Sequence, residues 1–229
     1  MSSSATARSA YHHGDLRNAL IRAAAELARE GGPRSVTIRA AARAVGVTPT
    51  AAYRHFAGHE ELLEATRERA MEQMAATMGA EVARLPHTDD PLRRALRNLA
   101  AVGLGYLNFA TAEPGLFRTC FTGATRGPHD SKTMEVWTAE PFLKAIAVID
   151  DLAAIGYLPP ERRPMAEVAI WSAVHGLAML FLDGPLHDAD EQTRLLAVER
   201  SFEVTAVGLG GAALAPELRE DLFAVLRDR

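Results

Sequence analysis

The 229-residue chain has one cysteine, few aromatic residues and no long apolar run, and each shortage excludes a class of protein. Its single cysteine, Cys120, rules out an intramolecular disulfide framework and suits a reducing cytoplasm. No stretch of about eighteen uninterrupted apolar residues predicts a membrane span, and the N-terminal segment MSSSATARSAYHHGD lacks the apolar core of a signal peptide. We therefore expect a cytoplasmic protein with no membrane partner.

Catalytic motifs and strand patterns are also missing. Cys120 has no histidine near it in sequence, and neither a serine nucleophile motif nor a phosphate-binding loop is present. The sequence predicts no enzyme, no cofactor and no bound metal. Instead of alternating strand patterns, the 48% apolar content forms long amphipathic helical patterns separated by proline and glycine. We therefore expect an all-α fold of nine to ten helices with a sizeable core.

Charge is unevenly distributed along the chain. Residues 1–59 contain eight arginines, no lysine and three acidic residues, a net charge of +5, although the whole chain carries −4. The remainder therefore carries −9. A basic module joined to an acidic body is typical of a protein that binds a polyanion and has a separate second function.

The segment TIRAAARAVGVTPTAAYRHF, residues 37–56, has the pattern of two short helices joined by a tight turn. Thr37 is expected to cap the first helix, and Gly46 to end it, since glycine takes the left-handed conformation without a steric penalty. Thr48 can cap the second helix, with Pro49 where no N–H is needed. A helix N-terminus in the major groove offers N–H groups to phosphate and short side chains to base edges. This pattern predicts a helix-turn-helix that contacts duplex DNA.

The stretch from Tyr11 to about Leu63 resembles the DNA-binding region of the TetR family of one-component transcriptional regulators. The matching features are the Gly31-Gly32 break, the Thr37 cap, the Gly46-Val47 turn and the sequence Tyr53-Arg54-His55-Phe56. The resemblance implies a three-helix DNA-binding domain followed by a larger helical domain for ligand binding and dimerisation. We expect a flexible tail over residues 1–14, the helix-turn-helix domain over 15–58 and the regulatory domain over 59–229.

The same resemblance implies which side chains meet DNA. Tyr53 and His55 are expected to bind phosphates, and Phe56 to lie in the core. The side chains expected to face bases or nearby backbone are Arg39, Thr48, Thr50, Ala51 and Arg54, and we include Thr37 at the start of the motif. At the start of the fourth helix, where the family often has a phosphate-holding lysine, this chain has His59, whose contact would depend on pH.

Further helices are expected in the body of the chain, near residues 59–84, 91–112, 114–123, 133–155, 161–182, 188–209 and 216–227. The stretch 166–184 is apolar on nearly every face, so more than one side must be buried. In the resembled family the last two long helices, here 161–182 and 188–209, form a four-helix homodimer interface. The set Trp171, His175 and Gly176 is similar to a regulatory-domain subtype marked by those residue types. A dimer would place two reading helices about 34 Å apart, matching a palindromic operator.

An unidentified, largely apolar small-molecule effector is expected inside the body. The candidate contacts are Phe109, Phe117, Phe121, Trp137, Trp171, His175 and Met179, although aromatic residues at helical spacing often only fill space. These features together predict a repressor that is released from DNA by a ligand. One alternative is a metal sensor using His175, Asp183, His187, Asp188 and Asp190, a run better explained by a turn and helix capping. Another is a structural DNA-binding protein, which would have no cavity in its body.

Overall fold

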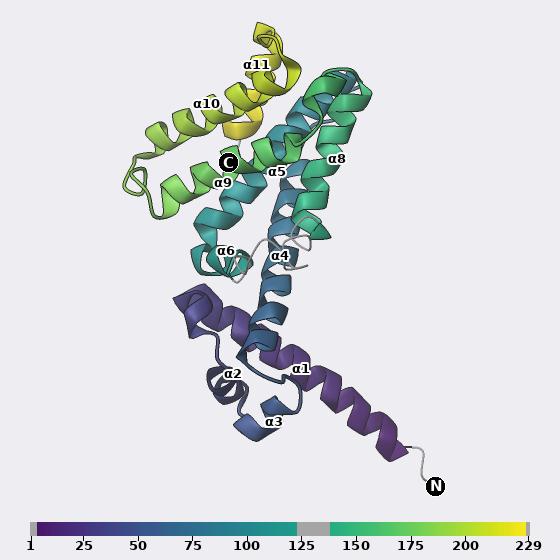
Figure 1. Cartoon of the computed structure of the whole chain (residues 1–229), viewed down its shortest axis with the longest axis vertical. Coiled ribbons are helices and arrows are strands. Elements are labelled where there is room, and N and C mark those ends of the chain that lie inside the picture. The colour runs from purple at the N-terminus through teal and green to yellow at the C-terminus, as the bar shows by residue number, and fades with distance from the viewer. Residues whose placement is uncertain (1–3, 123–137, 228–229) are drawn as a thin grey trace. The chain divides into compact units, whose positions relative to one another are not determined.

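The computed structural model describes residues 4–122 and 138–227, and of residues 4–15 the backbone alone. Within these ranges the chain forms ten α-helices, two 3₁₀ turns and no strand (Figure 1). The helices are α1 (Ser4–Gly31), α2 (Ile38–Val45), α3 (Pro49–Tyr53), α4 (His59–Ala83), α5 (Pro91–Ala112), α6 (Pro114–Cys120), α8 (Glu140–Ala154), α9 (Ala166–Leu182), α10 (Glu191–Gly210) and α11 (Pro216–Arg227), and the turns are η1 (Pro33–Ser35) and η2 (Pro160–Arg162). None of these helices is long and apolar enough to cross a membrane. The predicted all-α class is confirmed.

The described residues form two compact units. The first contains residues 4–72 and 113–122, and the second contains residues 73–112 and 138–227. The division therefore falls inside α4, whereas the sequence placed a domain limit at residue 58. The first unit is larger than the predicted domain because α6 packs against α1, where Arg29 Nε donates a hydrogen bond to Glu113 Oε2 at 2.7 Å.

The first helix reaches farther toward the N-terminus than expected. Residues 1–14 were predicted to be a flexible tail, whereas α1 is helical from Ser4 onward. Residues 4–13 contain three alanines and neither proline nor glycine, so nothing in this stretch ends a helix that starts there. The prediction missed this because the stretch has no apolar periodicity.

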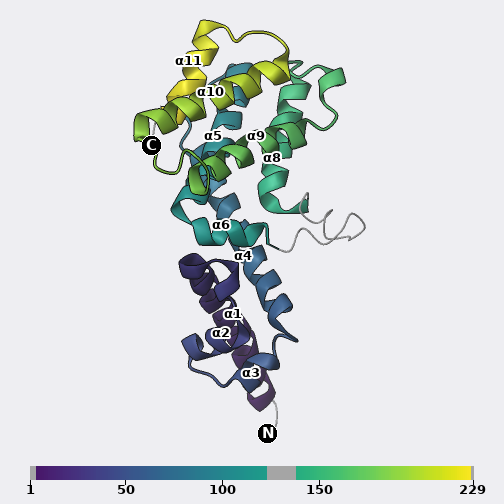
Figure 2. The ribbon, with the colours of Figure 1, turned by 60° about the vertical axis from the view of Figure 1, so that its left-hand side comes forward.

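In the second unit α5 is the central helix, because it contacts α8, α9 and α11. Its backbone also passes very close to α4 of the same unit, and a Cβ atom at Gly105 would lie 2.5 Å from Met78 Cα. The helices α9 and α10 pack on each other and run antiparallel, side by side, in both views (Figures 1 and 2). This arrangement leaves one face of the α9–α10 pair toward solvent.

Two predicted helix starts differ from the structure, and a third falls outside the described residues. The helix expected from 161 begins only at Ala166, because Pro164 has no N–H to donate and Met165 takes a left-handed φ of 62°. The helix expected from 188 begins at Glu191, because Asp190 is the cap and accepts a hydrogen bond from Thr193 N at 2.7 Å. This backbone hydrogen bond lowers the pKa of Asp190. The helix expected over 133–155 starts at Glu140, and residues 133–137 lie outside the described residues.

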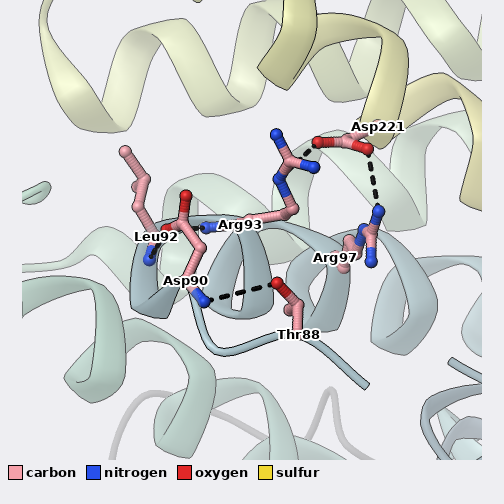
Figure 3. A network of polar contacts seen from close by, with 6 residues as sticks. All are labelled: Thr88, Asp90, Leu92, Arg93, Arg97 and Asp221. Carbon is pink, nitrogen blue, oxygen red and sulfur yellow. Dashed lines mark hydrogen bonds and ion pairs between the residues drawn. The ribbon is translucent and has the colours of Figure 1, made fainter. Parts of the chain in front are cut away.

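An ion-pair network fastens the C-terminal helix to α5 (Figure 3). Asp221 of α11 lies between two arginines of α5, with Oδ2 2.8 Å from Arg93 Nε and Oδ1 2.8 Å from Arg97 Nη2. At the start of α5, Asp90 Oδ1 accepts hydrogen bonds from the backbone N–H groups of Leu92 and Arg93, at 2.9 and 3.1 Å. The capping aspartate thus sets the position at which α5 begins, and Asp221 holds α11 against it.

Candidate nucleic-acid interface and candidate ligand cavity

Residues 37–56 form two helices joined by a turn, and neighbouring residues fix both ends of the first helix. Thr37 Oγ1 accepts a hydrogen bond from Ala40 N at 3.1 Å, which caps α2. Gly46 ends α2 with φ 81° and ψ 27°, and its N–H points to the carbonyl of Ala42. Both predicted roles, the threonine cap and the left-handed glycine, are confirmed.

The second helix of the motif is short and is capped in the same way. Thr48 Oγ1 accepts a hydrogen bond from Ala51 N at 3.2 Å, and Pro49 occupies the first turn. Ala52 and Phe56 are 0% and 1% exposed, so one side of α3 and the residues after it are held in the core. Phe56 is a core residue, as its sequence context predicts, and the opposite side of α3 faces outward.

The residues expected to meet DNA lie at the surface of the first unit. The exposed members are Thr37, Arg39, Thr48, Thr50, Tyr53, Arg54 and His59, and the half-buried members are Ala51 and His55. Tyr53 is 52% exposed, although tyrosine commonly buries its ring. An outward-facing phenol beside an arginine gives this surface donors for phosphate oxygens.

The ionised side chains of residues 31–59 have one sign. Residues 31–59 contain four arginines and no acidic residue, and all four arginines are exposed. They are Arg34, Arg39, Arg43 and Arg54. Arg34 and Arg43 were not among the predicted contacts, although the same charge count marks them. Such a surface attracts the phosphate backbone of a nucleic acid.

A cavity with apolar walls lies inside the second unit. The cavity is partly open to solvent at its mouth. The lining residues are Met78 of α4, Leu99, Val102, Gly103 and Tyr106 of α5, Pro141, Phe142, Ala145 and Val148 of α8, Glu167, Ile170, Trp171, Ala173 and Val174 of α9, and Ser201, Phe202 and Thr205 of α10. Concave sites with aromatic and aliphatic walls and a few polar groups are typical of small-molecule binding.

A short chain of hydrogen bonds crosses one wall of the cavity. Trp171 Nε1 donates to the hydroxyl of Tyr106 at 3.3 Å, and that hydroxyl lies 2.8 Å from His175 Nδ1. Burial lowers the pKa of His175, so the ring is neutral at pH 7. The neutral ring accepts the Tyr106 proton at Nδ1. The hydroxyl of Tyr106 thus links the ring nitrogens of Trp171 and His175 along this wall.

Among the described lining residues, Glu167 is the one acidic side chain. Its Oε2 accepts a hydrogen bond from Arg163 Nη1 at 2.9 Å. Arg163 also donates to Asp150 Oδ1 from Nη2 at 2.8 Å and from Nε at 3.1 Å. The hydrogen bond to Asp150 is the first cause, and that to Glu167 a further cause, of the raised pKa of Arg163.

Two of the seven residues expected to bind a ligand are brought to this cavity. Trp171 lines it, and His175 is hydrogen-bonded to a lining side chain. Four others do not line it: Phe109 and Phe117 are buried, Phe121 is half-buried and Met179 is exposed. Phe117 of α6 and Phe121, which directly follows α6, belong to the first unit and pack on each other, with ring centroids 5.2 Å apart. Trp137 lies outside the described residues.

Several lining residues were not predicted as ligand contacts. The main ones are Glu167 of α9 and Phe202 of α10. Helical periodicity identifies apolar faces, but it does not show where packed helices leave a gap. One feature of the sequence could have indicated Glu167, because it is the only Asp, Glu, Lys or Arg in the α9 sequence AEVAIWSAVHGLAMLFL.

Two further observations concern the cysteine and the candidate metal ligands. Burial raises the pKa of the Cys120 thiol to about 12, so it is not ionised at neutral pH. The part of the chain that the structure describes holds no group of three or more His, Cys, Asp and Glu side chains that could bind a metal ion. Asp190, one of the five metal-ligand candidates, instead caps α10.

An exposed basic helix-turn-helix and a separate helical unit with an apolar cavity define a DNA-binding regulator. A family profile described as "Bacterial regulatory proteins, tetR family" matches residues 20–66, and one described as "Tetracyclin repressor-like, C-terminal domain" matches residues 99–206. These ranges hold 47 and 108 residues, together more than half of the 229-residue chain. The chain belongs to the TetR family of transcription regulators.

Solved structures share the fold. A protein with unknown function from Rhodococcus sp. RHA1 is 23% identical, with a TM-score of 0.69, over 87% of this chain and 98% of that chain. A TetR family transcription regulator from Marinobacter aquaeolei VT8 is 20% identical, with a TM-score of 0.58, over 84% and 96% of the two chains. RolR in complex with resorcinol is 17% identical, with a TM-score of 0.61, over 96% and 97%. No curated protein sequence matches the chain.

Proposed function

We propose that this regulator is a homodimeric repressor that binds a palindromic operator and leaves it when a small, largely apolar effector enters the cavity. The observation that carries the proposal is the apolar cavity itself. A structural DNA-binding protein needs no such space, because an unfilled cavity costs stability. We assign the regulatory domain to the Trp171-His175-Gly176 subtype and place the protein in the cytoplasm, with its DNA.

For the DNA contacts we propose a division of roles along α3. Tyr53 and His55 hold phosphates and so fix the position of the helix. Thr50 and Ala51 are small enough to approach base edges, where a thymine methyl or one hydrogen bond gives selectivity. The exposed Arg39 and Arg54 add positive charge to this surface. Affinity then depends strongly on salt, because arginine binding releases counterions from DNA.

For the response to ligand we propose α4 as the moving element. Met78, in the second unit, lines the cavity, and His59, in the first unit, begins the same helix. An effector that displaces Met78 moves α4 and so changes the separation of the two reading helices in a dimer. This requires that the effector bind more tightly to the DNA-incompetent state than to the competent one. Resorcinol, the ligand held by RolR, is a small aromatic molecule of the kind that this cavity suits.

For the dimer we propose the outward face of α9 and α10. Leu196 and Val204 of α10 are 62% and 61% exposed, two turns apart on one side of the helix. Gly176 of α9 and Gly208 of α10 have no atom within 4 Å of a Cβ built on them, so a second helix can approach closely. Large exposed apolar side chains with small residues beside them fit a self-complementary interface.

The test is a gel shift with the DNA upstream of the chain's own coding sequence. We expect a retarded complex that weakens steeply as salt is raised, and that cell extract containing the effector dissociates. An unrelated duplex of the same length is the control. If the upstream and unrelated duplexes bind equally at every salt concentration, specific operator recognition is wrong, and if no extract or compound ever changes DNA affinity, the sensing role is wrong.

A pair of variants separates recognition from bulk charge. Arg54→Ala removes an exposed charge beside α3 and is expected to weaken operator binding and to reduce the salt slope by about 1. Arg84→Ala removes the same charge from the residue that follows α4 in the second unit, where the side chain is 71% exposed, and is expected to change neither. Equal losses in the two variants would contradict the proposed interface.

A further inference from the structure

The charges around the cavity are unequal, which bears on the chemistry of its occupant. Among the described residues that line it, Glu167 is the only charged side chain, and no lysine, arginine or histidine is present. Burying an anionic ligand beside this carboxylate would place two like charges together in a poorly hydrated space. Carboxylates and phosphates are therefore disfavoured.

The arginine that is hydrogen-bonded to Glu167 does not remove this bias against anionic ligands. Arg163 does not line the cavity, and it also donates two hydrogen bonds to Asp150. The three side chains together carry a net charge of −1. The two hydrogen bonds to Asp150 do not involve Glu167, so the guanidinium would keep a partner if Glu167 turned toward a ligand.

Aromatic rings stand close to this carboxylate. Trp171 follows Glu167 by one helical turn on α9, so both side chains lie on the same face of that helix. Phe142 of α8 meets the Trp171 ring edge-on, with centroids 5.2 Å apart and an interplanar angle of 84°. Aromatic faces attract cations through their ring quadrupole, most strongly where water is excluded.

We infer that the effector is an aromatic organic cation, whose rings lie against Trp171 and Phe142 and whose positive charge lies near Glu167. This inference deepens the proposed function and rests on it, since it concerns the ligand of the same cavity. Both a carboxylate and an aromatic wall favour the cation, whereas an uncharged aromatic gains from the wall alone. Selectivity for charge therefore depends on Glu167.

Titration calorimetry with three probes of one ring system tests the inference on the full-length protein. N-methylquinolinium is the cation, 4-methylquinoline is the uncharged molecule with the same number of heavy atoms, and quinoline-4-carboxylate is the anion. At mildly alkaline pH we expect the cation to bind about tenfold or more tightly than 4-methylquinoline, and the anion to bind most weakly. Equal or weaker binding of the cation, or no binding of the cation, overturns the inference.

Two matched variants locate the source of the preference. Glu167→Gln is expected to bring the affinity ratio of cation to uncharged probe close to one, while the affinity for 4-methylquinoline stays unchanged. Asp151→Asn removes the same charge from an exposed position on α8 that does not line the cavity, and should keep the ratio. A ratio that survives in Glu167→Gln overturns the role of Glu167. If Glu167→Gln also loses affinity for 4-methylquinoline, the substitution has altered the cavity itself. The affinity ratio of cation to uncharged probe in the unmodified protein then decides whether the inference holds.

Failure of this inference can be distinguished from failure of the proposed function. If the chain binds its operator and releases it with an uncharged or anionic compound, only the inference is wrong and the proposed function stands. If the chain prefers N-methylquinolinium through Glu167 but never binds DNA, or never changes its DNA affinity with ligand, the proposed function is wrong and the cation site stands.

Discussion

The hydroxyl of Tyr106 lies 2.8 Å from Nδ1 of His175 and joins α5 to α9 at the wall of the cavity. The same hydroxyl accepts the indole N–H of Trp171 at 3.3 Å. Without it, two polar ring nitrogens of α9 would lose their hydrogen bonds to α5 in an apolar region. The wall that an effector would touch thus depends on one oxygen atom.

Removing that oxygen is expected to destabilise the protein. Tyr106→Phe deletes one hydrogen-bond acceptor and one donor at half-buried partners, and we expect a loss of about 1–2 kcal/mol in the free energy of unfolding. Denaturant unfolding followed by circular dichroism measures this. Tyr53→Phe, which removes a hydroxyl from a 52% exposed side chain, is the control and should change stability little. The two variants losing the same stability would show that the network does not matter.

His175 is expected to make stability depend on pH. Its pKa in the folded protein is lowered from 6.5 by burial, so the unfolded chain binds more protons between the folded value and 6.5. The stability that neutral His175 contributes is therefore fully present above pH 6.5, and it is lost as the pH falls from 6.5 through the folded-state pKa. Melting temperatures at about pH 7.5 and pH 5.5 measure the loss.

A substitution assigns this acid sensitivity to one ring. His175→Gln keeps a hydrogen-bond acceptor near Tyr106 but cannot gain a proton, so its melting temperature should fall less on acidification than that of the unmodified protein. His187→Gln removes an exposed histidine from the same unit and is the control. If the melting temperature of His175→Gln falls on acidification as much as that of the unmodified chain, His175 is not the source of the acid sensitivity.

The helix-turn-helix could be predicted in detail because its determinants are neighbours in sequence. Thr37, Gly46 and Thr48 act on residues at most four positions away, and each takes its expected role. The start of α9 could not be placed in this way. Apolar composition predicted a helix from 161, but the left-handed Met165 interrupts it, and that conformation is not visible in a hydrophobic pattern.

The cavity was harder to predict because it is formed by distant parts of the chain. Trp171 and His175 were marked by their polar nitrogens within an apolar stretch, and the structure places both at or next to its wall. Phe117 looked equally suitable in sequence, yet it is fully buried in α6 of the first unit. Whether an aromatic ring borders a gap or fills the core depends on which helices meet there, and that information is not local.

The close approach of α5 and α4 in the second unit predicts a sensitive glycine. A Cβ at Gly105 would lie 2.5 Å from Met78 Cα and 2.9 Å from Met78 N, and backbone atoms cannot turn aside. We expect overpacking in Gly105→Ala to lower the free energy of unfolding by about 1–3 kcal/mol. This loss is larger than the stability gained from the higher helix propensity of alanine. Gly79→Ala is the control, since its nearest neighbour is the flexible Lys144 Nζ at 3.7 Å. Thermal unfolding compares the two, and a Gly105→Ala protein as stable as Gly79→Ala would contradict the close approach.

The exposed leucine and valine of α10 are expected to hold two copies of the chain together. Leu196→Glu and Val204→Glu each place a charge on the proposed dimer face, where it would be buried without a partner. We expect both variants to sediment as monomers and to bind the operator much more weakly, because a single reading helix contacts one half-site. Leu143→Glu changes a 50% exposed leucine of α8 and should remain dimeric. An unmodified chain that sediments as a monomer and still binds its operator tightly at nanomolar concentration would rule out this interface as a requirement for recognition.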